Sequence, residues 1–176
     1  IMNKEALDVL KNRRSIRKYK SEQIRDDELK AVLEAGTYGA TGAGTQSPTI
    51  IAVQNPELIR VLNKMNAAVM GKPEATPYYG APTVIFTFAS AKAVTPDEDA
   101  IIVAANMLNA SYAVGLGSCW IHRSRQMFET DEGRKLKKQW GLADDDYCMS
   151  SIAVGYPDCE QPAAKPRKEG YYRIIK

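Results

Sequence analysis

The chain has 176 residues, which is enough for one domain with a hydrophobic core of its own. Hydrophobic residues make up 44% of it and charged residues 26%, as is normal for a soluble globular protein. The net charge of +3 neither requires nor excludes a nucleic-acid partner, so the position of the charges matters more than their total.

Cysteine and histidine are scarce. Cys119, Cys148 and Cys159 are odd in number, so they cannot all pair within one chain, and they form no C-x-x-C motif. Together with His122 they give four scattered candidates for a zinc site, which normally has four Cys or His ligands. We therefore expect no metal site, and a reducing compartment rather than a secreted disulfide scaffold. The first twenty residues lack the apolar run of a signal peptide, which predicts a cytoplasmic protein.

Helical and extended patterns alternate in the first half of the chain. Residues 4–12 predict a short helix with one apolar face. Asp26 and Asp27 predict an N-cap and a favourable first-turn charge for a second helix, over residues 26–36. The other elements of this half are a glycine-rich loop, a strand and a helix, at residues 36–48, 49–54 and 56–70.

The second half is predicted to hold a strand, a helix, a strand, a helix and a strand, at residues 83–89, 97–114, 117–121, 130–140 and 148–154. The helix over 97–114, capped by Asp97 or Thr95, is apolar on nearly every side, which indicates burial at the centre or in a subunit interface. It lies in an uncharged stretch, 100–121, that is long enough to span a bilayer. Asparagines, serines and glycines in this stretch weaken insertion, so we expect a buried helix and no membrane partner.

The C-terminal tail, residues 161–176, cannot build a core of its own. Residues 171–175 are β-formers that have no neighbouring hairpin partner, so we expect them to pair with another subunit. The order of the elements predicts an α+β fold, with helices and a sheet in mixed layers. Residues 1–176 are expected to form a single domain, from which the tail extends.

The segment Arg13-Arg14-Ser15-Ile16-Arg17, the clamp segment, combines arginine and serine donors suited to a phosphate or a ribityl hydroxyl. If it is partly extended, Arg13, Ser15 and Arg17 share one face and form a three-point anion site. From charge alone, a solvated basic face or a nucleic-acid patch explains the segment at least as well.

The glycine-rich loop, residues 36–48, has four glycines in nine positions, which lets backbone amides approach a ligand closely. It carries Thr41, Thr45 and Gln46 but matches neither a P-loop nor G-x-G-x-x-G, so a flexible surface loop is an open alternative.

Two further segments are candidates for ligand contacts. Gly115-Leu-Gly-Ser-Cys-Trp-Ile121 could present backbone amides to a flat ring, or could simply cap the preceding helix. In Lys165-Pro166-Arg167, proline keeps the chain extended, so both cations point to the same side. The alternative there is an ordinary basic tail.

Hydrolytic arrangements fit poorly. Cys119 and His122 are three residues apart, so on a strand they face opposite sides of the sheet. A Ser-His-Asp triad would have to use His122, and the chain has no G-x-S-x-G motif. We therefore expect no covalent catalysis and name no catalytic side chain.

The clamp segment and the residues after it, to Tyr19, resemble the opening signature of the nitroreductase family, which are FMN-dependent NAD(P)H oxidoreductases. Three later segments resemble further flavin segments of that family in the same order: residues 41–48, 110–121, and 154–157 through 165–168. Two departures lie in the second segment. Gly44 stands where many members have asparagine, and Ser47-Pro48 where many have proline and an aromatic residue.

The resemblance implies an FMN site. The residues expected to hold its phosphate and ribityl chain are Arg13, Arg14, Ser15, Arg17, Lys165 and Arg167. Those expected along the flavin, from the partner subunit, are Thr41, Gly42, Gly44 and Gln46. Those expected beside the isoalloxazine, with Asn66 as a contact to its edge, are Cys119, Trp120, Ile121 and His122.

The resemblance also implies a homodimer with interlocked subunits, a mostly antiparallel central sheet flanked by helices, and a C-terminal strand that crosses to the partner. NADH or NADPH would reduce FMN, and a small acceptor such as a nitroaromatic or a quinone would then be reduced in the same pocket, by a ping-pong mechanism. Alternatives are a flavin-storage or reductive dehalogenase-like protein, or a nucleic-acid or anion-binding module that uses residues 11–20 and 165–168. Acidic residues nearly balance the basic ones, which disfavours nucleic acid.

Overall fold

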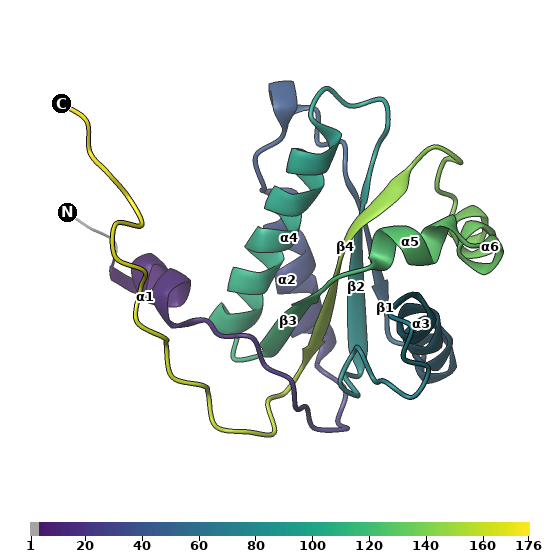
Figure 1. Ribbon diagram of the computed structural model, residues 1–176, viewed down its shortest axis with the longest axis horizontal. Coiled ribbons are helices and arrows are strands. Elements are labelled where there is room, and N and C mark those ends of the chain that lie inside the picture. The colour runs from purple at the N-terminus through teal and green to yellow at the C-terminus, as the bar shows by residue number, and fades with distance from the viewer. Residues whose placement is uncertain (1–3) are drawn as a thin grey trace.

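The computed structural model describes residues 4–176 and places a four-stranded antiparallel sheet between layers of helices (Figure 1). The strands, in spatial order, are β1 (Thr49–Val53), β2 (Thr83–Ala89), β4 (Tyr147–Gly155) and β3 (Gly117–Ile121). The helices are α1 (Lys4–Asn12), α2 (Asp26–Thr37), α3 (Pro56–Val69), α4 (Pro96–Ala113), α5 (Ser124–Glu129) and α6 (Asp131–Gln139), with a short 3-10 helix, η1 (Gly42–Gly44). The predicted α+β fold is confirmed.

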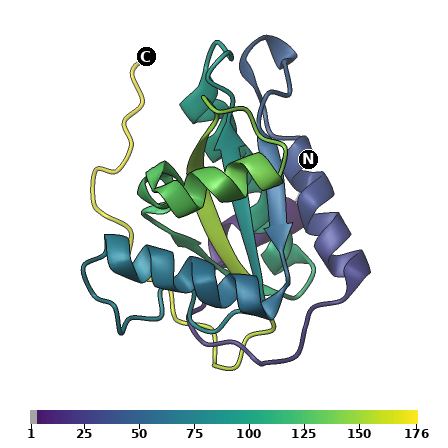
Figure 2. The same cartoon turned by 90° about the vertical axis from the view of Figure 1, so that its right-hand side faces the viewer.

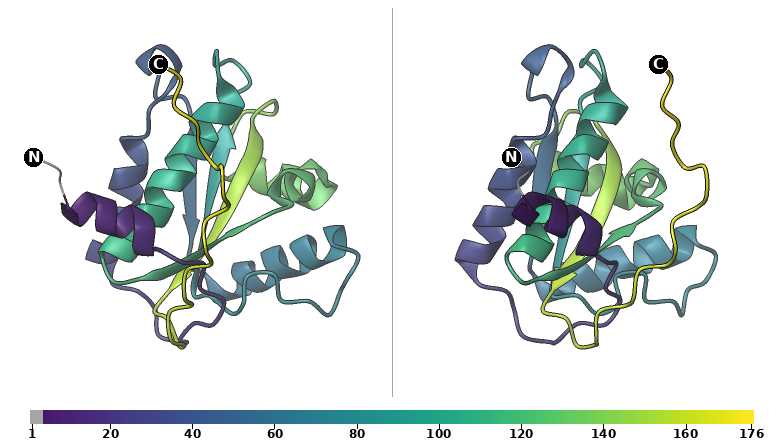
Figure 3. Two further views of the ribbon diagram at one scale, coloured as in Figure 1. Left: turned by 60° about the vertical axis from the view of Figure 1, so that its left-hand side comes forward. Right: turned by 90° about the vertical axis from the view of Figure 1, so that its left-hand side faces the viewer.

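Strand β2 is buried along its whole length because helices cover both faces of the sheet. Successive side chains of a strand point to opposite faces. Phe86 and Phe88 therefore join α3, α5 and α6 in one core cluster, whereas Ile85 joins α2 and α4 in the other. Figure 2 shows α3, α5 and α6 in front of the sheet, and Figure 3 shows α4 on the opposite face.

An aromatic group fills the core on the α5 side. The ring of Phe128 lies 5.2 Å from that of Phe86 and 4.9 Å from that of Phe88, both edge to face. Such pairs add about 0.5–1.5 kcal/mol each beyond the area they bury. Trp140, whose ring lies 5.6 Å from that of Phe128, completes the group.

Helix α4 packs one face on the sheet and leaves part of its apolar surface open in the single chain. Thr95 is its N-cap residue, and Val103 and Met107 are buried. Ile101 and Ile102 are each 39% exposed. Burial on all sides, predicted from the sequence, is therefore not reached within one chain. No described helix, α4 included, is long and apolar enough to cross a membrane.

One local prediction was wrong, and one helix was not predicted. Asp26 and Asp27 lie in the first turn of α2, and Arg25 is the N-cap residue, whose amide donates to the Glu28 carboxylate at 3.0 Å. The helix predicted from Thr130 is preceded by a second helix, α5, because Thr130 ends α5 and also caps α6. Its hydroxyl accepts the first-turn amide of Gly133 at 3.1 Å.

The segments before α2 and after β4 lie side by side at the edge of the sheet (Figure 3). The Ile16 amide donates to the Ser118 carbonyl of β3 at 2.9 Å, and the Lys20 amide donates to the Tyr156 carbonyl at 2.9 Å. Residues 161–176 then continue as an exposed extended tail. Pairing of this tail with a partner subunit stays a prediction.

Candidate functional site

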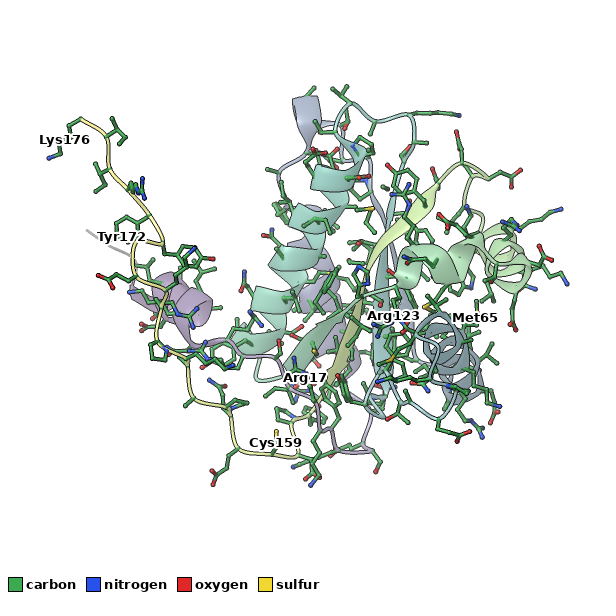
Figure 4. All side chains as sticks on the ribbon, viewed as in Figure 1. Arg17, Met65, Arg123, Cys159, Tyr172 and Lys176 are labelled. Atoms are coloured by element: carbon green, nitrogen blue, oxygen red, sulfur yellow. The ribbon has the colours of Figure 1, made fainter. Side chains whose placement is uncertain are left out.

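The clamp segment runs beside β3, where Ser15 forms an isolated parallel bridge with Ser118. Ile16 is buried, whereas Arg17 is exposed at the lower end of β3 (Figure 4). Burial raises the pKa of the Cys119 thiol, and this effect is opposed by Arg17, by a hydrogen bond from Ser15 and by Arg13. That Arg13, Ser15 and Arg17 share one face stays a prediction.

A cavity of about 200 Å³ lies between the clamp segment, the end of α4 and the start of the tail. Arg13, Arg14, Ser118 and Gln161 line it. The Ser118 hydroxyl is buried and has no hydrogen-bond partner within residues 4–176. A buried polar group without a partner costs about 1–3 kcal/mol. The cavity is therefore suited to a polar ligand that this hydroxyl and the two arginines can bind.

Arg14 also caps the C-terminal end of α1, beside the cavity. Its guanidinium donates to the carbonyls of Lys11, at 2.7 Å, and Arg13, at 2.6 Å, and so covers the C-terminal end of α1. Gln161, from the start of the tail, donates to the carbonyl of Asn12 at 2.7 Å. The end of α1, the clamp segment and the tail are thereby joined around the cavity.

Strand β3 forms the wall beside the clamp segment. A Cβ atom at Gly117 would lie 2.9 Å from Ile16, so glycine allows the close approach of the two segments. Cys119 and Ile121 point into the core, and only their backbone can face a ligand. Trp120 and His122 point the other way, are exposed, and have ring centroids 5.6 Å apart.

The turn after β3 is held by Asn66 of α3, which is fully buried. The Asn66 amide nitrogen donates to the His122 carbonyl at 2.9 Å, and its oxygen accepts from Arg123 Nε at 3.0 Å. Arg123 has a φ of 78°, in the left-handed region that favours glycine. Figure 4 shows Arg123 on the α3 side of β3. The amide predicted to contact a ring edge is thus engaged within the chain and positions this turn.

The glycine-rich loop lies far from the clamp segment in the same chain (Figure 1). Asp99, at the start of α4, binds the amide of Gly42, whereas Tyr112, at the end of α4, lines the cavity. Asp99 and Tyr112 are 13 positions apart on α4, which corresponds to about 20 Å at 1.5 Å per residue. We therefore do not expect Thr41, Gly42, Gly44 and Gln46 to touch a ligand held by Arg13 of their own chain.

Lys165 and Arg167 lie on the exposed tail. The Arg167 guanidinium turns back onto the carbonyl of Lys165, at 2.7 and 3.2 Å. Figure 4 shows the tail, with Tyr172 and Lys176, extending away from the sheet. The predicted convergence of these two cations on the clamp segment stays a prediction.

Three of the polar residues described above could not be singled out from the sequence. Ser118 stood inside a segment noted only for its backbone, Arg123 followed the last residue considered, and Asp99 resembled an ordinary first-turn acid. A serine or an aspartate in such a place carries no local signal of its long-range partners.

The sequence model of the Nitroreductase family matches residues 10–156. Among solved structures, a nitroreductase with bound FMN from Bacteroides fragilis is 27% identical, covers 98% of this chain and 99% of its own, and has a TM-score of 0.86. An FMN-dependent nitroreductase from Clostridium difficile is 23% identical, with 98% and 100% covered and a TM-score of 0.87. A putative NADH oxidase from Clostridium acetobutylicum is 23% identical, with 96% and 99% covered and a TM-score of 0.76. A comparison with curated proteins gave no match.

Proposed function

We propose, since the chain belongs to the nitroreductase family, that it binds FMN and transfers electrons from NADH or NADPH to an organic acceptor such as a nitroaromatic or a quinone. The observation that carries the proposal is the cavity beside β3, where the unpaired Ser118 hydroxyl lies with Arg13 and Arg14. The Bacteroides fragilis relative contains FMN, which supports the choice of ligand.

The residues around the cavity fit the polar end of FMN. Arginine offers paired N–H donors that match phosphate oxygens, and the Ser118 hydroxyl would gain the partner that it lacks. A cavity of about 200 Å³ is smaller than the roughly 300–1,000 Å³ of pockets that enclose a whole drug-sized ligand. One chain therefore encloses part of the cofactor, and the ring would extend along the edge of β3 toward His122.

Bound FMN would supply the hydride chemistry, while the protein supplies binding, orientation and electrostatics. We assign Arg13, Ser15 and Arg17 to phosphate and ribityl binding, and the backbone of β3 to the ring. The donor and the acceptor would occupy the same pocket in turn, which predicts ping-pong kinetics. Burial raises the pKa of Cys119, so its thiol is protonated at neutral pH, and we assign no catalytic side chain.

A homodimer would complete this site. Ile101 and Ile102 on α4 are partly exposed, and the tail carries four apolar side chains that are 73–90% exposed: Tyr171, Tyr172, Ile174 and Ile175. Such surfaces mark protein–protein contacts. If the α4 helices of two copies pack antiparallel across a two-fold axis, the glycine-rich loop of each copy meets the clamp segment of the other. This would supply the flavin contacts that one chain cannot make.

The test is flavin retention in an Arg17→Ala variant. The purified protein should be yellow, and NADH or NADPH should bleach it. A charge-assisted hydrogen bond contributes about 1.5–3 kcal/mol, so loss of Arg17 should weaken FMN binding by roughly 10- to 150-fold. Arg60→Ala, which removes an exposed arginine of α3, is the matched control and should keep its flavin.

Each other outcome has a defined meaning. Full flavin occupancy in Arg17→Ala would show that the clamp assignment is wrong. A yellow protein that neither NADH nor NADPH bleaches would support flavin storage instead. A colourless protein that ignores added FMN would refute the proposal.

A further inference from the structure

We infer that Asp99 is a positioning residue, which fixes the tip of the glycine-rich loop in the shape that contacts the flavin bound by the partner subunit. This inference rests on the proposed function. Asp99 lies at the start of α4 and does not line the cavity beside β3.

The Asp99 carboxylate joins both ends of the loop tip. It is 2% exposed. One oxygen accepts from the Gly42 amide at 2.9 Å and from the Thr95 hydroxyl at 2.7 Å, and the other accepts from the Ser47 hydroxyl at 2.9 Å. Gly42 and Ser47 lie on either side of the tip, so the Asp99 side chain links both ends of the tip to α4.

These hydrogen bonds of Asp99 require glycine at position 42. A Cβ atom there would lie 2.2 Å from the Thr95 hydroxyl oxygen, which is itself held by Asp99. Any larger residue would push the loop away from α4 and break the hydrogen bond from Gly42 to the carboxylate. The close contact between the loop and α4 therefore depends on three residues: Gly42, Thr95 and Asp99.

The loop tip is strained, although backbone hydrogen bonds from Gly44 to Thr41, at 3.0 Å, and from Thr45 to Gly42, at 3.2 Å, close it internally. Ala43 and Gln46 have φ values of 51° and 52°, in the left-handed region, where a residue other than glycine is strained. Such strain persists only when the surroundings impose it. The hydrogen bond from the Gln46 amide to the Thr41 hydroxyl, at 3.0 Å, lies within the tip, so Asp99 provides the anchor outside it.

Core packing does not explain this arrangement. Residues 43–46 are exposed, so the loop buries no apolar side chain in return for the burial of a carboxylate. Burying a charge is costly unless it is fully hydrogen-bonded. A fixed, exposed and strained tip is instead typical of a ligand-binding surface. In the proposed dimer it faces the partner's flavin.

The first experiment compares FMN binding by the whole protein and its Asp99→Asn variant. Asparagine has the same shape, but its NH2 group cannot accept the hydrogen bonds that one carboxylate oxygen accepts. We expect about tenfold weaker binding of FMN, which corresponds to about 1.4 kcal/mol. Glu98→Gln, at an exposed acid of the same helical turn, is the matched control and should bind FMN like the parent. Ser47→Ala breaks only one contact and should have a smaller effect.

The second experiment tests the action across the dimer. Two differently tagged subunits, one with Arg17→Ala and one with Asp99→Asn, are expressed together, and the hybrid dimer is isolated through both tags. If each loop serves the partner's flavin, one site of the hybrid carries both defects and the other carries none. The hybrid should then bind one FMN per dimer with the parent's affinity, while both variant homodimers bind weakly. A general loss of stability would not restore one site.

The outcomes separate the two proposals. If the parent protein does not bind FMN, the proposed function is refuted, and the flavin role of Asp99 with it. If the parent binds FMN and Asp99→Asn binds it equally tightly, only the role of Asp99 is refuted. A hybrid dimer without a tight site would show that the loop does not act across the interface.

Discussion

The buried amide of Asn66 offers the sharpest test of how the turn after β3 is held. Replacement of Asn66 by alanine removes the donor to the His122 carbonyl and the acceptor for Arg123 Nε. Both partners come from the turn that connects β3 to α5, so the change separates this turn from α3. No water can reach the original site easily, because Asn66 is fully buried.

The cost follows from the two bonds. A neutral hydrogen bond contributes about 1 kcal/mol and one to a charged group about 1.5–3 kcal/mol, so the loss should be about 2.5–4 kcal/mol. For a protein of this size, each kcal/mol lowers Tm by about 2–4 °C. We therefore expect Asn66→Ala to melt roughly 5–16 °C below the parent protein.

The assay is thermal unfolding of the flavin-free protein, followed by circular dichroism. Asn12→Ala, at an exposed position at the end of α1, is the control and should change stability by less than about 0.5 kcal/mol. A second pair of variants isolates the backbone. Arg123→Gly and Arg123→Ala lose the same side chain, but only alanine keeps the strain of the left-handed φ, so the glycine variant should be more stable by about 1 kcal/mol. If Asn66→Ala melts within 2 °C of the parent, the two hydrogen bonds do not hold the turn.

Two further predictions concern packing and pH. Gly133→Ala should destabilise the protein by at least about 1–3 kcal/mol in urea unfolding. Its Cβ atom would lie 2.2 Å from the Met127 carbonyl oxygen, and the backbone cannot move away there. An unchanged unfolding midpoint would contradict this packing of α5 on α6. Burial opposes the charged form of Asp99, but hydrogen bonds from the Gly42 amide and from the Thr95 and Ser47 hydroxyls outweigh it, so the pKa of Asp99 is lowered. The charged carboxylate therefore contributes stability above its unfolded pKa of about 3.9, and this contribution disappears as the pH falls through the lower folded value. Acid titration of the parent and of Asp99→Asn should show a shallower acid limb for the variant, and identical limbs would contradict the assignment.

Elements with strong local signals could be predicted from the sequence, whereas those set by a neighbour could not. β2 and β3 have the predicted limits. Apolar β-formers fill most of β2, and β3 begins at Gly117, just after the glycine turn at Gly115 that follows α4. Helix α5 was missed because it has only six residues and follows Arg123, whose left-handed conformation is not visible in the sequence. Asp26 and Asp27 looked like a cap, but the Glu28 carboxylate reaches back to the Arg25 amide and moves the cap by one residue.

The same distinction applies to the candidate site. The burial of Ile16 beside an exposed Arg17 agrees with alternation along an extended segment, whereas the common face of Arg13, Ser15 and Arg17 stays a prediction. The role of Asp99 could not, because its partners Gly42 and Ser47 lie 57 and 52 positions away in the chain. The position of the tail cations relative to the clamp segment stays a prediction.

Three buried polar side chains bear on the proposed flavin binding, and they differ in one respect. Asp99 and Asn66 have their hydrogen-bonding atoms engaged by backbone and side chains of the same chain, and each holds a strained segment. Ser118 alone among the three has a hydroxyl without a partner in the described residues. Asp99 and Asn66 are explained by the backbone shape that each of them fixes. An unpaired buried group lowers stability, so the Ser118 hydroxyl is explained only by a bound ligand. Because Arg13 and Arg14 line the same cavity as that hydroxyl, an anionic ligand is the simplest partner.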